Sequence, residues 1–139
     1  MLFPKKVKYR KWHIMRKNPN KISPATRGIE ISFGSHGLKA ISAGRVTSNQ
    51  IEAARKIISR NLGKTGRVWV RIFPDMPFTK KPAEVKMGKG KGDIEGYQVR
   101  ILPGQVLFEA ESTSEIIARE SLRKGGCKMP VKTKIVTRQ

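Results

Sequence analysis

The chain has 139 residues, enough for one domain with a buried core, and no stretch approaches the roughly 18 consecutive apolar residues of a membrane-spanning helix. A single Cys excludes an intrachain disulfide framework and a Cys-based zinc site. The 30 Lys and Arg against 10 Asp and Glu give a formal net charge of +20, and self-repulsion on this scale indicates a polyanionic partner.

The N-terminal third is predicted to hold a basic arm and a hairpin. Residues 1–27 lack a hydrophobic period and lack Asp and Glu, which is typical of an extended arm. Residues 28–33 alternate apolar and polar side chains and predict a strand, followed by a turn at 34–37. Residues 38–43, with a bulge at Ala40-Ile41, predict a second strand that completes the hairpin and ends at Gly44.

The first helix has clear signals at both ends. Thr47 and Gln50 form a capping box, and Gly63 fits the left-handed position that ends a helix. An apolar stripe at steps of three and four residues connects them, made of Ile51, Ala54, Ile58 and Leu62. Residues 67–73 then predict a strand, which Pro74 and Pro77 stop.

The remaining elements surround a long loop. Residues 76–92 are rich in Lys and Gly and lack a period, which predicts a functional or disordered loop. Two strands are predicted at 94–102 and 105–110, joined by a Pro103-Gly104 turn.

The chain ends on a second helix and a last strand. A capping box from Ser112 to Glu115 predicts the start of the helix, which Gly125-Gly126 weakens at its end. Residues 131–136 predict a basic strand. Six strands and two helices in the order β-β-α-β-loop-β-β-α-β predict a single α+β domain, with a mixed or antiparallel sheet carrying both helices and a core over residues 28–139.

The basic residues are concentrated in three segments. Residues 1–28 carry nine Lys and Arg, residues 76–92 carry five, and residues 123–139 carry six, and these segments contain only one acid, Glu84. Charge separated in this way creates a directed field, whereas mixed charges would only confer solubility.

No catalytic or metal-binding constellation is visible. His13 and His36 lack a carboxylate at ligand or triad spacing, and Cys127 is interpreted as a small semi-buried residue on a helix face. The pairs Asp93/Glu95 and Glu109/Glu111 share a strand face, which is most often the solvated face of an antiparallel sheet. We therefore expect no enzyme, no cofactor and no metal.

Two segments point to RNA. The arm interleaves aromatic rings and cations in Tyr9-Arg10-Lys11-Trp12-His13, which suits stacking on unpaired bases beside phosphate contacts. Alternatively, Tyr9 and Trp12 dock the arm onto the core, and the two roles are compatible with each other. Residues 87–92 alternate Gly and Lys, so the backbone can approach a polyanion closely, although a disordered linker has the same pattern.

Several runs closely resemble the bacterial-type L-sixteen family of large-ribosomal-subunit proteins. They are Met-Leu-Phe-Pro at 1–4 before a basic stretch, Ser-Phe-Gly-Ser at 32–35, Gly-Leu-Lys-Ala at 37–40, Gln-Ile-Glu-Ala-Ala-Arg at 50–55, Phe-Pro-Asp at 73–75 with Pro77, Lys81-Pro82, Met-Gly-Lys-Gly-Lys-Gly at 87–92, Pro103-Gly104, Ala-Arg-Glu at 118–120 and Lys-Met-Pro-Val-Lys-Thr at 128–133. The resemblance covers essentially the whole chain. Lys86 stands where some members carry a hydroxylated Arg, and residues 125–127 stand where members are Ala-rich.

The resemblance implies an α+β fold with a hammerhead-like β arrangement and a place in a cytoplasmic or organellar ribosome. The implied partners are large-subunit rRNA, tRNA and neighbouring large-subunit proteins, with no membrane and no homo-oligomer. The implied role is to organise the A-site region near the peptidyl-transferase centre, with contact to A-site and possibly P-site tRNA and without catalysis. A free RNA-binding factor or chaperone and a nucleic-acid-processing enzyme are the competing hypotheses.

Charge and resemblance together define two sets of candidate residues. The rRNA-binding set is Lys5, Lys6, Lys8, Tyr9, Arg10, Lys11, Trp12, His13, Arg16, Lys17, Lys21, Arg27, Arg55, Lys56, Arg60, Lys128, Lys132 and Lys134. The tRNA-binding set is Lys80, Lys81, Lys86, Met87, Gly88, Lys89, Gly90, Lys91 and Gly92.

Overall fold

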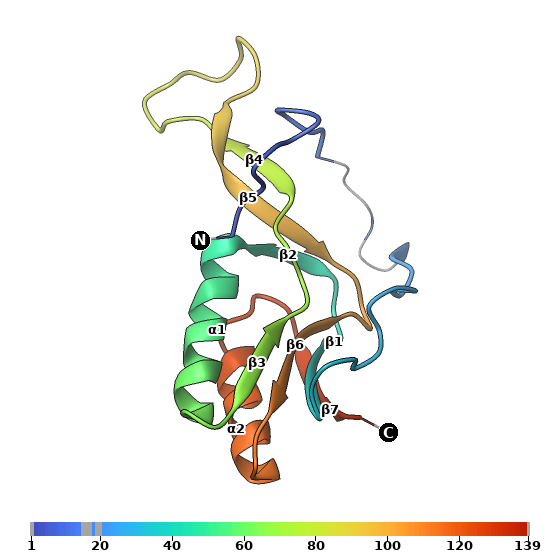
Figure 1. Cartoon of the computed structure of the whole chain (residues 1–139). Coiled ribbons are helices and arrows are strands. Elements are labelled where there is room, and N and C mark those ends of the chain that lie inside the picture. The colour runs from blue at the N-terminus through green and yellow to red at the C-terminus, as the bar shows by residue number, and fades with distance from the viewer. Residues whose placement is uncertain (1, 15–17, 19–20, 139) are drawn as a thin grey trace.

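The computed structural model describes residues 2–14, 18 and 21–138, and their fold consists of two antiparallel sheets and two helices (Figure 1). The elements are β1 (His36–Ala40), β2 (Gly44–Thr47), α1 (Ser48–Leu62), β3 (Arg67–Val70), β4 (Met76–Lys80), β5 (Asp93–Ile101), β6 (Val106–Glu111), α2 (Glu115–Gly126) and β7 (Thr133–Thr137). One sheet has the order β3-β6-β1-β7 and the other has the order β2-β5-β4. The predicted α+β class is confirmed, with two sheets in place of one; the hammerhead likeness stays a prediction.

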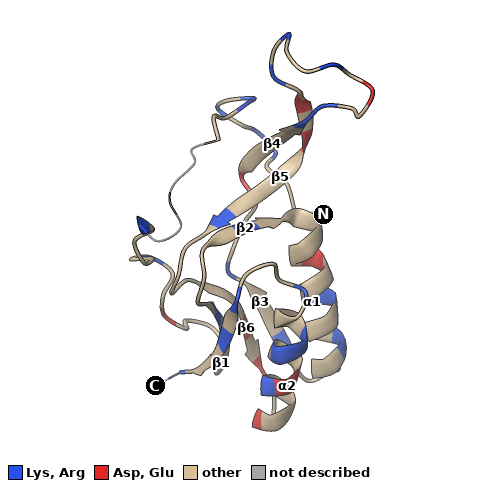
Figure 2. Cartoon of the chain, turned by 180° about the vertical axis from the view of Figure 1, so that it is seen from behind, with Lys and Arg blue, Asp and Glu red and all other residues tan. Residues whose placement is uncertain are grey.

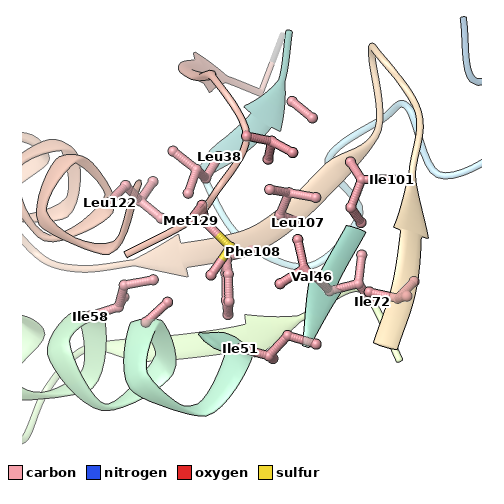
Figure 3. Close-up of a cluster of buried hydrophobic side chains, with 14 of the residues drawn as sticks. Leu38, Val46, Ile51, Ile58, Ile72, Ile101, Leu107, Phe108, Leu122 and Met129 are labelled. Carbon is pink, nitrogen blue, oxygen red and sulfur yellow. The ribbon is translucent and has the colours of Figure 1, made fainter. Parts of the chain in front are cut away.

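The core lies between the two helices and the sheets, and side chains of both sheets contribute to it (Figure 3). Helix α1 contributes the predicted stripe of Ile51, Ala54, Ile58 and Leu62, all buried. They meet side chains from both sheets, among them Leu38, Phe108 and Ile101. Burial of each such side chain contributes roughly 1.5–3 kcal/mol, so this cluster is the main source of stability.

Helix α1 begins and ends where its sequence signals predict. Thr47 is the N-cap: its side chain accepts from the Gln50 backbone N–H at 3.4 Å, and the Gln50 side chain accepts from the Thr47 N–H at 2.9 Å. The reciprocal capping box is therefore confirmed. Gly63 follows the helix with φ 72°, a backbone conformation that favours glycine.

The predicted strand at 28–33 is wrong. The backbone N–H groups of Ser32, Phe33 and Gly34 donate to the carboxylate of Glu109, at 3.1, 2.6 and 2.9 Å, and so form no strand ladder. Ile31 instead lies against Gly37, where an added Cβ would come within 3.0 Å of the Ile31 side chain. The apolar–polar alternation thus arises from packing of an irregular segment onto the sheet.

The predicted hairpin is also wrong. Strand β1 begins at His36, inside the predicted turn, and pairs with β6 and β7. Its register shifts between Leu38 and Lys39, not at Ala40-Ile41. Gly44 does not end a strand but begins β2, which pairs with β5 in the other sheet.

The predicted loop at 76–92 is shorter in the structure. Strand β3 ends at Val70, and residues 76–80 form β4 despite Pro77. Pro77 is tolerated because β4 is an edge strand, paired only with β5, where a missing N–H need not break a ladder. The connecting loop therefore spans residues 81–92, and Lys80 belongs to the strand.

Helix α2 starts later than predicted. Its N-cap is Ser114, which makes no side-chain capping bond, so the capping box from Ser112 is wrong. The helix does end at Gly126. An added Cβ at Gly125 would lie 2.5 Å from Ile58 Cγ1, so this glycine permits the close approach of α2 to α1. Strand β7 begins at Thr133, two residues later than predicted.

Candidate nucleic-acid interface

The loop at residues 81–92 projects from the end of the β4–β5 pair, farthest from the helices (Figure 1). Met87 at its tip is 95% exposed. Gly88 and Gly90 have φ 97° and 96°, and Lys89 between them has φ 54°. The backbone conformation therefore explains why glycine stands at positions 88 and 90, since L side chains rarely adopt such φ values.

The base of the loop is tightly built. An added Cβ at Gly92 would lie 2.7 Å from the carbonyl oxygen of Lys80, so only glycine lets the two strands meet there. The Lys81 ammonium donates to the carbonyl of Gly88, which folds the loop back on itself. Lys80 forms an ion pair with Glu95 across the strands at 3.5 Å.

The N-terminal arm runs beside this loop base. Lys11 Nζ lies 3.5 Å from the Asp93 carboxylate and donates to the Lys91 carbonyl at 3.4 Å. In return, the Lys91 ammonium donates to the carbonyl of Trp12. Figure 1 shows the blue arm alongside β4 and β5. The structure thus brings together two basic segments that are about eighty residues apart in the sequence.

The aromatic residues of the arm face solvent. Tyr9 is 60% exposed and Trp12 is 39% exposed, and neither belongs to the core. Within the described part of the arm, Leu2 packs against the core. The ammonium of Lys8 lies 5.6 Å from the centre of the Tyr9 ring. The alternative that Tyr9 and Trp12 anchor the arm in the core is therefore not supported.

Most arm cations have no acidic partner. Among the described residues, ion pairs of the arm are limited to Lys11 with Asp93, so the remaining arm cations are not neutralised. The exposed candidates are Lys5, Lys6, Lys8, Arg10, His13, Lys21 and Arg27. Arg16 and Lys17 lie outside the described residues.

The other predicted rRNA-binding residues lie on separate elements. Lys56 and Arg60 are exposed on the C-terminal half of α1, and Lys128, Lys132 and Lys134 are exposed near the C-terminus. Figure 2 shows that both helices lie away from the loop. The candidate set therefore forms at least two surfaces instead of one continuous patch.

Arg55 is less available than predicted. Its guanidinium forms a two-pronged hydrogen bond with the carboxylate of Glu52, at 2.9 and 2.7 Å. This bond lowers the pKa of Glu52 and raises the pKa of Arg55. Arg55 can contact a phosphate only with the groups that Glu52 leaves unused.

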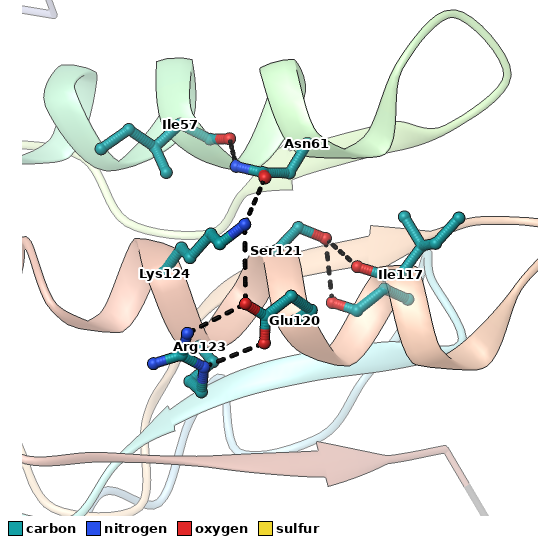
Figure 4. Close-up of polar contacts among 8 residues, drawn as sticks. Ile57, Asn61, Ile117, Glu120, Ser121, Arg123 and Lys124 are labelled. Atoms are coloured by element: carbon teal, nitrogen blue, oxygen red, sulfur yellow. Dashed lines mark hydrogen bonds and ion pairs between the residues drawn. The ribbon is translucent and has the colours of Figure 1, made fainter.

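Helix α2 pairs its charges internally (Figure 4). Arg123 donates to Glu120 at 3.0 and 2.9 Å, and this hydrogen bond, with the charges of Arg123 and Lys124, lowers the pKa of Glu120 to about 2. Lys124 also donates to Asn61 of α1 at 2.9 Å. Arg123 is thus paired within α2 and Lys124 joins α2 to α1, in contrast with the cations of the arm.

Glu109 corrects the interpretation that Glu109 and Glu111 form a solvated face. Its side chain is fully buried and forms an ion pair with Arg71, while Glu111 is exposed. Burial acts to raise the pKa of Glu109, but three backbone N–H donors and Arg71 outweigh it, so the pKa lies below its ordinary value. The sequence carried no signal that separates the two residues.

His36 and Cys127 both lie in surroundings that differ from the predicted ones. His36 is buried in β1 and not in a turn: its Nδ1 lies 2.9 Å from the Ser35 hydroxyl, and its Nε2 lies 3.6 Å from Glu115. Cys127 is exposed at the end of α2, not semi-buried. Across residues 2–14, 18 and 21–138, no group of three His, Cys, Asp or Glu could hold a metal ion, and no helix is long and apolar enough to cross a membrane.

The chain matches a family model described as "Ribosomal protein L16p/L10e" over residues 4–136. The chain belongs to this family. It is 49% identical over 139 residues to the "Large ribosomal subunit protein uL16" of Cereibacter sphaeroides, covering 100% of this chain and 98% of that protein. A protein of the same name from Maricaulis maris is 50% identical over 99% of this chain and 98% of its own length. The Caulobacter vibrioides protein of that name is 49% identical, with 99% and 94% covered.

Membership of the family makes the chain a constituent of the large ribosomal subunit and of the translation machinery, alongside rRNA and other ribosomal proteins. It is a structural component and not an enzyme. The hypotheses of a free RNA-binding factor and of a nucleic-acid-processing enzyme are set aside on this ground.

Proposed function

We propose that the chain binds large-subunit rRNA directly and contacts A-site tRNA near the peptidyl-transferase centre. The observation that carries this proposal is the joint placement of the unneutralised basic arm and the Gly-Lys loop at one end of the molecule. Two acid-poor segments side by side create a field that attracts a polyanion.

The two segments have different roles in this proposal. The arm, Lys56 and Arg60 of α1, and the C-terminal lysines hold the protein on rRNA. The loop contacts tRNA, because its exposed lysines offer charge on flexible stems without the rigid fork of Arg. Among the described residues, the hydrogen bonds and the ion pair that join the arm to the loop lie at the loop base, at Lys91 and Asp93.

The test removes charge from the tip and spares the base. In the double variant Lys86→Ala/Lys89→Ala, we expect nearly normal incorporation into large subunits and roughly tenfold weaker A-site tRNA binding, since a hydrogen bond to a charged group contributes about 1.5–3 kcal/mol and exposed contacts less. Lys91 is kept, because it also holds the arm. Incorporation is measured by sedimentation of subunits, and tRNA affinity by filter binding to them.

A matched variant, Lys128→Ala/Lys132→Ala, removes the same charge from the proposed rRNA-binding set. We expect it to weaken incorporation at raised salt and to leave tRNA affinity of the assembled subunits unchanged. If the loop variant lost incorporation while tRNA affinity stayed normal, the proposed division of roles would be wrong.

A further inference from the structure

A compact aromatic and cationic cluster lies away from the arm and the loop. The rings of Phe33 and Trp69 stack with centroids 6.2 Å apart and an interplanar angle of 19°. The guanidinium carbon of Arg71 lies 5.1 Å from the centre of the Phe33 ring. Despite these contacts, Phe33 is 57% exposed. We call Phe33, Trp69 and Arg71 the aromatic platform.

The platform lies on the face of the four-stranded sheet opposite the helices. Val68 and Val70 pack against the core, so the alternating residues Trp69 and Arg71 point to the other face. Phe33 reaches this face from the irregular segment before β1. Gly34 permits the approach, because an added Cβ there would lie 2.8 Å from the carbonyl oxygen of Ala110 in β6.

One buried carboxylate holds both halves of the platform. Glu109 accepts from the backbone N–H groups of Ser32, Phe33 and Gly34 and forms an ion pair with Arg71. The Phe33 backbone and the Arg71 guanidinium are thus fixed before any ligand binds. Such preorganisation lowers the entropic cost of binding, and a purely structural role would not require Phe33 to stay exposed.

Two lysines of the same sheet face provide a site for phosphate. Lys39 of β1 and Lys134 of β7 are direct cross-strand partners. Like charges placed opposite each other destabilise a sheet, and neither lysine has an ion pair within the described ranges. Strand β1 lies two strands from β3, or roughly 10 Å, so a nucleotide on the platform could place its backbone near Lys39.

We propose that the aromatic platform is an additional RNA-binding site, on which an unpaired base of large-subunit rRNA stacks against Phe33 while its backbone approaches Lys39 and Lys134. The proposal rests on the direct rRNA binding proposed above. An RNA nucleotide fits better than a protein side chain because its base has a flat face for the ring and its phosphate can contact the cations.

The test compares two phenylalanines of similar exposure. Phe33→Leu keeps an apolar side chain and removes the ring, and Phe73→Leu does the same at a residue that is 46% exposed and makes no ring contact in the described part of the chain. Binding of the full-length proteins to purified, protein-free large-subunit rRNA is measured by filter binding. For Phe33→Leu, we expect a loss of roughly 5- to 100-fold, the range of base stacking. For Phe73→Leu, we expect wild-type affinity.

A fluorescence measurement separates stacking from misfolding. The chain has two tryptophans, Trp12 and Trp69, so the Trp12→Phe variant leaves Trp69 as the single reporter. We expect single-stranded oligouridine to quench Trp69 fluorescence, and a duplex of the same length to quench it less, because only unpaired bases can stack. Circular dichroism of each variant confirms the fold.

The outcomes distinguish this site from the proposed function. If wild-type protein did not bind the rRNA, direct rRNA binding itself would fail. If wild type bound and both Leu variants bound equally well, the platform would be rejected and rRNA binding would stand. If Phe33→Leu bound free rRNA normally but failed to enter subunits, a protein neighbour would occupy the platform, and the proposal would again be rejected.

Discussion

The two ends of the molecule use the same residue types in opposite ways. On α2, Arg119, Arg123 and Lys124 each have a carboxylate partner within 3.5 Å. In the arm, Lys11 has such a partner in Asp93, while Lys5, Lys6 and Lys8 have none among the described residues. The count of positive charges therefore does not separate the two regions; the placement of the acids beside them does.

The largest effect is expected where a charge is most buried. Replacing Glu109 by Ala should lower the free energy of unfolding by about 3 kcal/mol or more, because it leaves Arg71 and three backbone N–H groups without their acceptor. Urea denaturation measures the loss. Glu111→Ala, two residues along the same strand and exposed, is the matched control and should change stability little.

The same carboxylate should make stability depend on pH. Its pKa is lower in the folded chain than in the unfolded one, so its contribution is complete above the unfolded pKa and is lost as pH falls through the folded pKa. Wild-type stability should therefore drop in acid more steeply than that of Glu109→Gln. Equal slopes would show that Glu109 is not the group that titrates.

Removal of the arm should act on binding more than on folding. Without residues 1–17, we expect RNA affinity to fall at least tenfold, with a shallower dependence on salt, because each lost phosphate contact removes roughly 0.7–0.9 from the slope of log K against log salt. Binding titrations at several salt concentrations measure both. Full-length Leu2→Ala tests whether any loss of stability in the truncation comes from Leu2, which packs on the core.

Local sequence signals predicted the parts of the fold that depend on local chemistry. The capping box at Thr47 and the stripe to Leu62 are complete within one helix, and β5 and β6 are bounded by turn residues, so these elements could be predicted. Residues 28–33 could not, because their hydrogen-bond acceptor is Glu109, more than seventy positions away. No local pattern reveals such a partner.

The segments of the candidate site could be predicted from the sequence, but the contacts between them could not. The acid-free arm and the Gly-Lys loop are compositional features, and the sequence identifies them directly. Their contact through Lys11 and Lys91 depends on tertiary structure. Phe33 and Trp69 have the sequence pattern of ordinary strand residues, and nothing in the sequence shows that the two rings meet.

A smaller loss of stability is expected from Gly125→Ala, because the space around Gly125 is crowded. Gly125→Ala improves helix propensity by about 1 kcal/mol but places a Cβ 2.5 Å from Ile58 Cγ1, and overpacking costs about 1–3 kcal/mol. We expect net destabilisation in thermal or urea unfolding. Adding Ile58→Val should recover part of it, because this change removes Ile58 Cδ1, which would lie 2.6 Å from the added Cβ, although it keeps Cγ1. A stabilised single variant would show that the helices separate easily.

The smallest effect is expected at the contact between the arm and the loop base. The Asp93 side chain is 93% exposed, and exposed ion pairs contribute about 0–1 kcal/mol, so Asp93→Asn should weaken the contact of the arm with the loop base only slightly. Hydrogen exchange of the backbone N–H groups of residues 9–13 should rise up to fivefold. Glu95→Gln breaks the 3.5 Å pair with Lys80, which does not involve the arm, and should leave that exchange unchanged. Suppose that Asp93→Asn left hydrogen exchange of residues 9–13 unchanged while Lys91→Ala raised it. The hydrogen bond from Lys91 to the Trp12 carbonyl would then be the contact that positions the arm. If neither had an effect, the arm and the loop would be independent, and their adjacency would have no energetic consequence in the free protein.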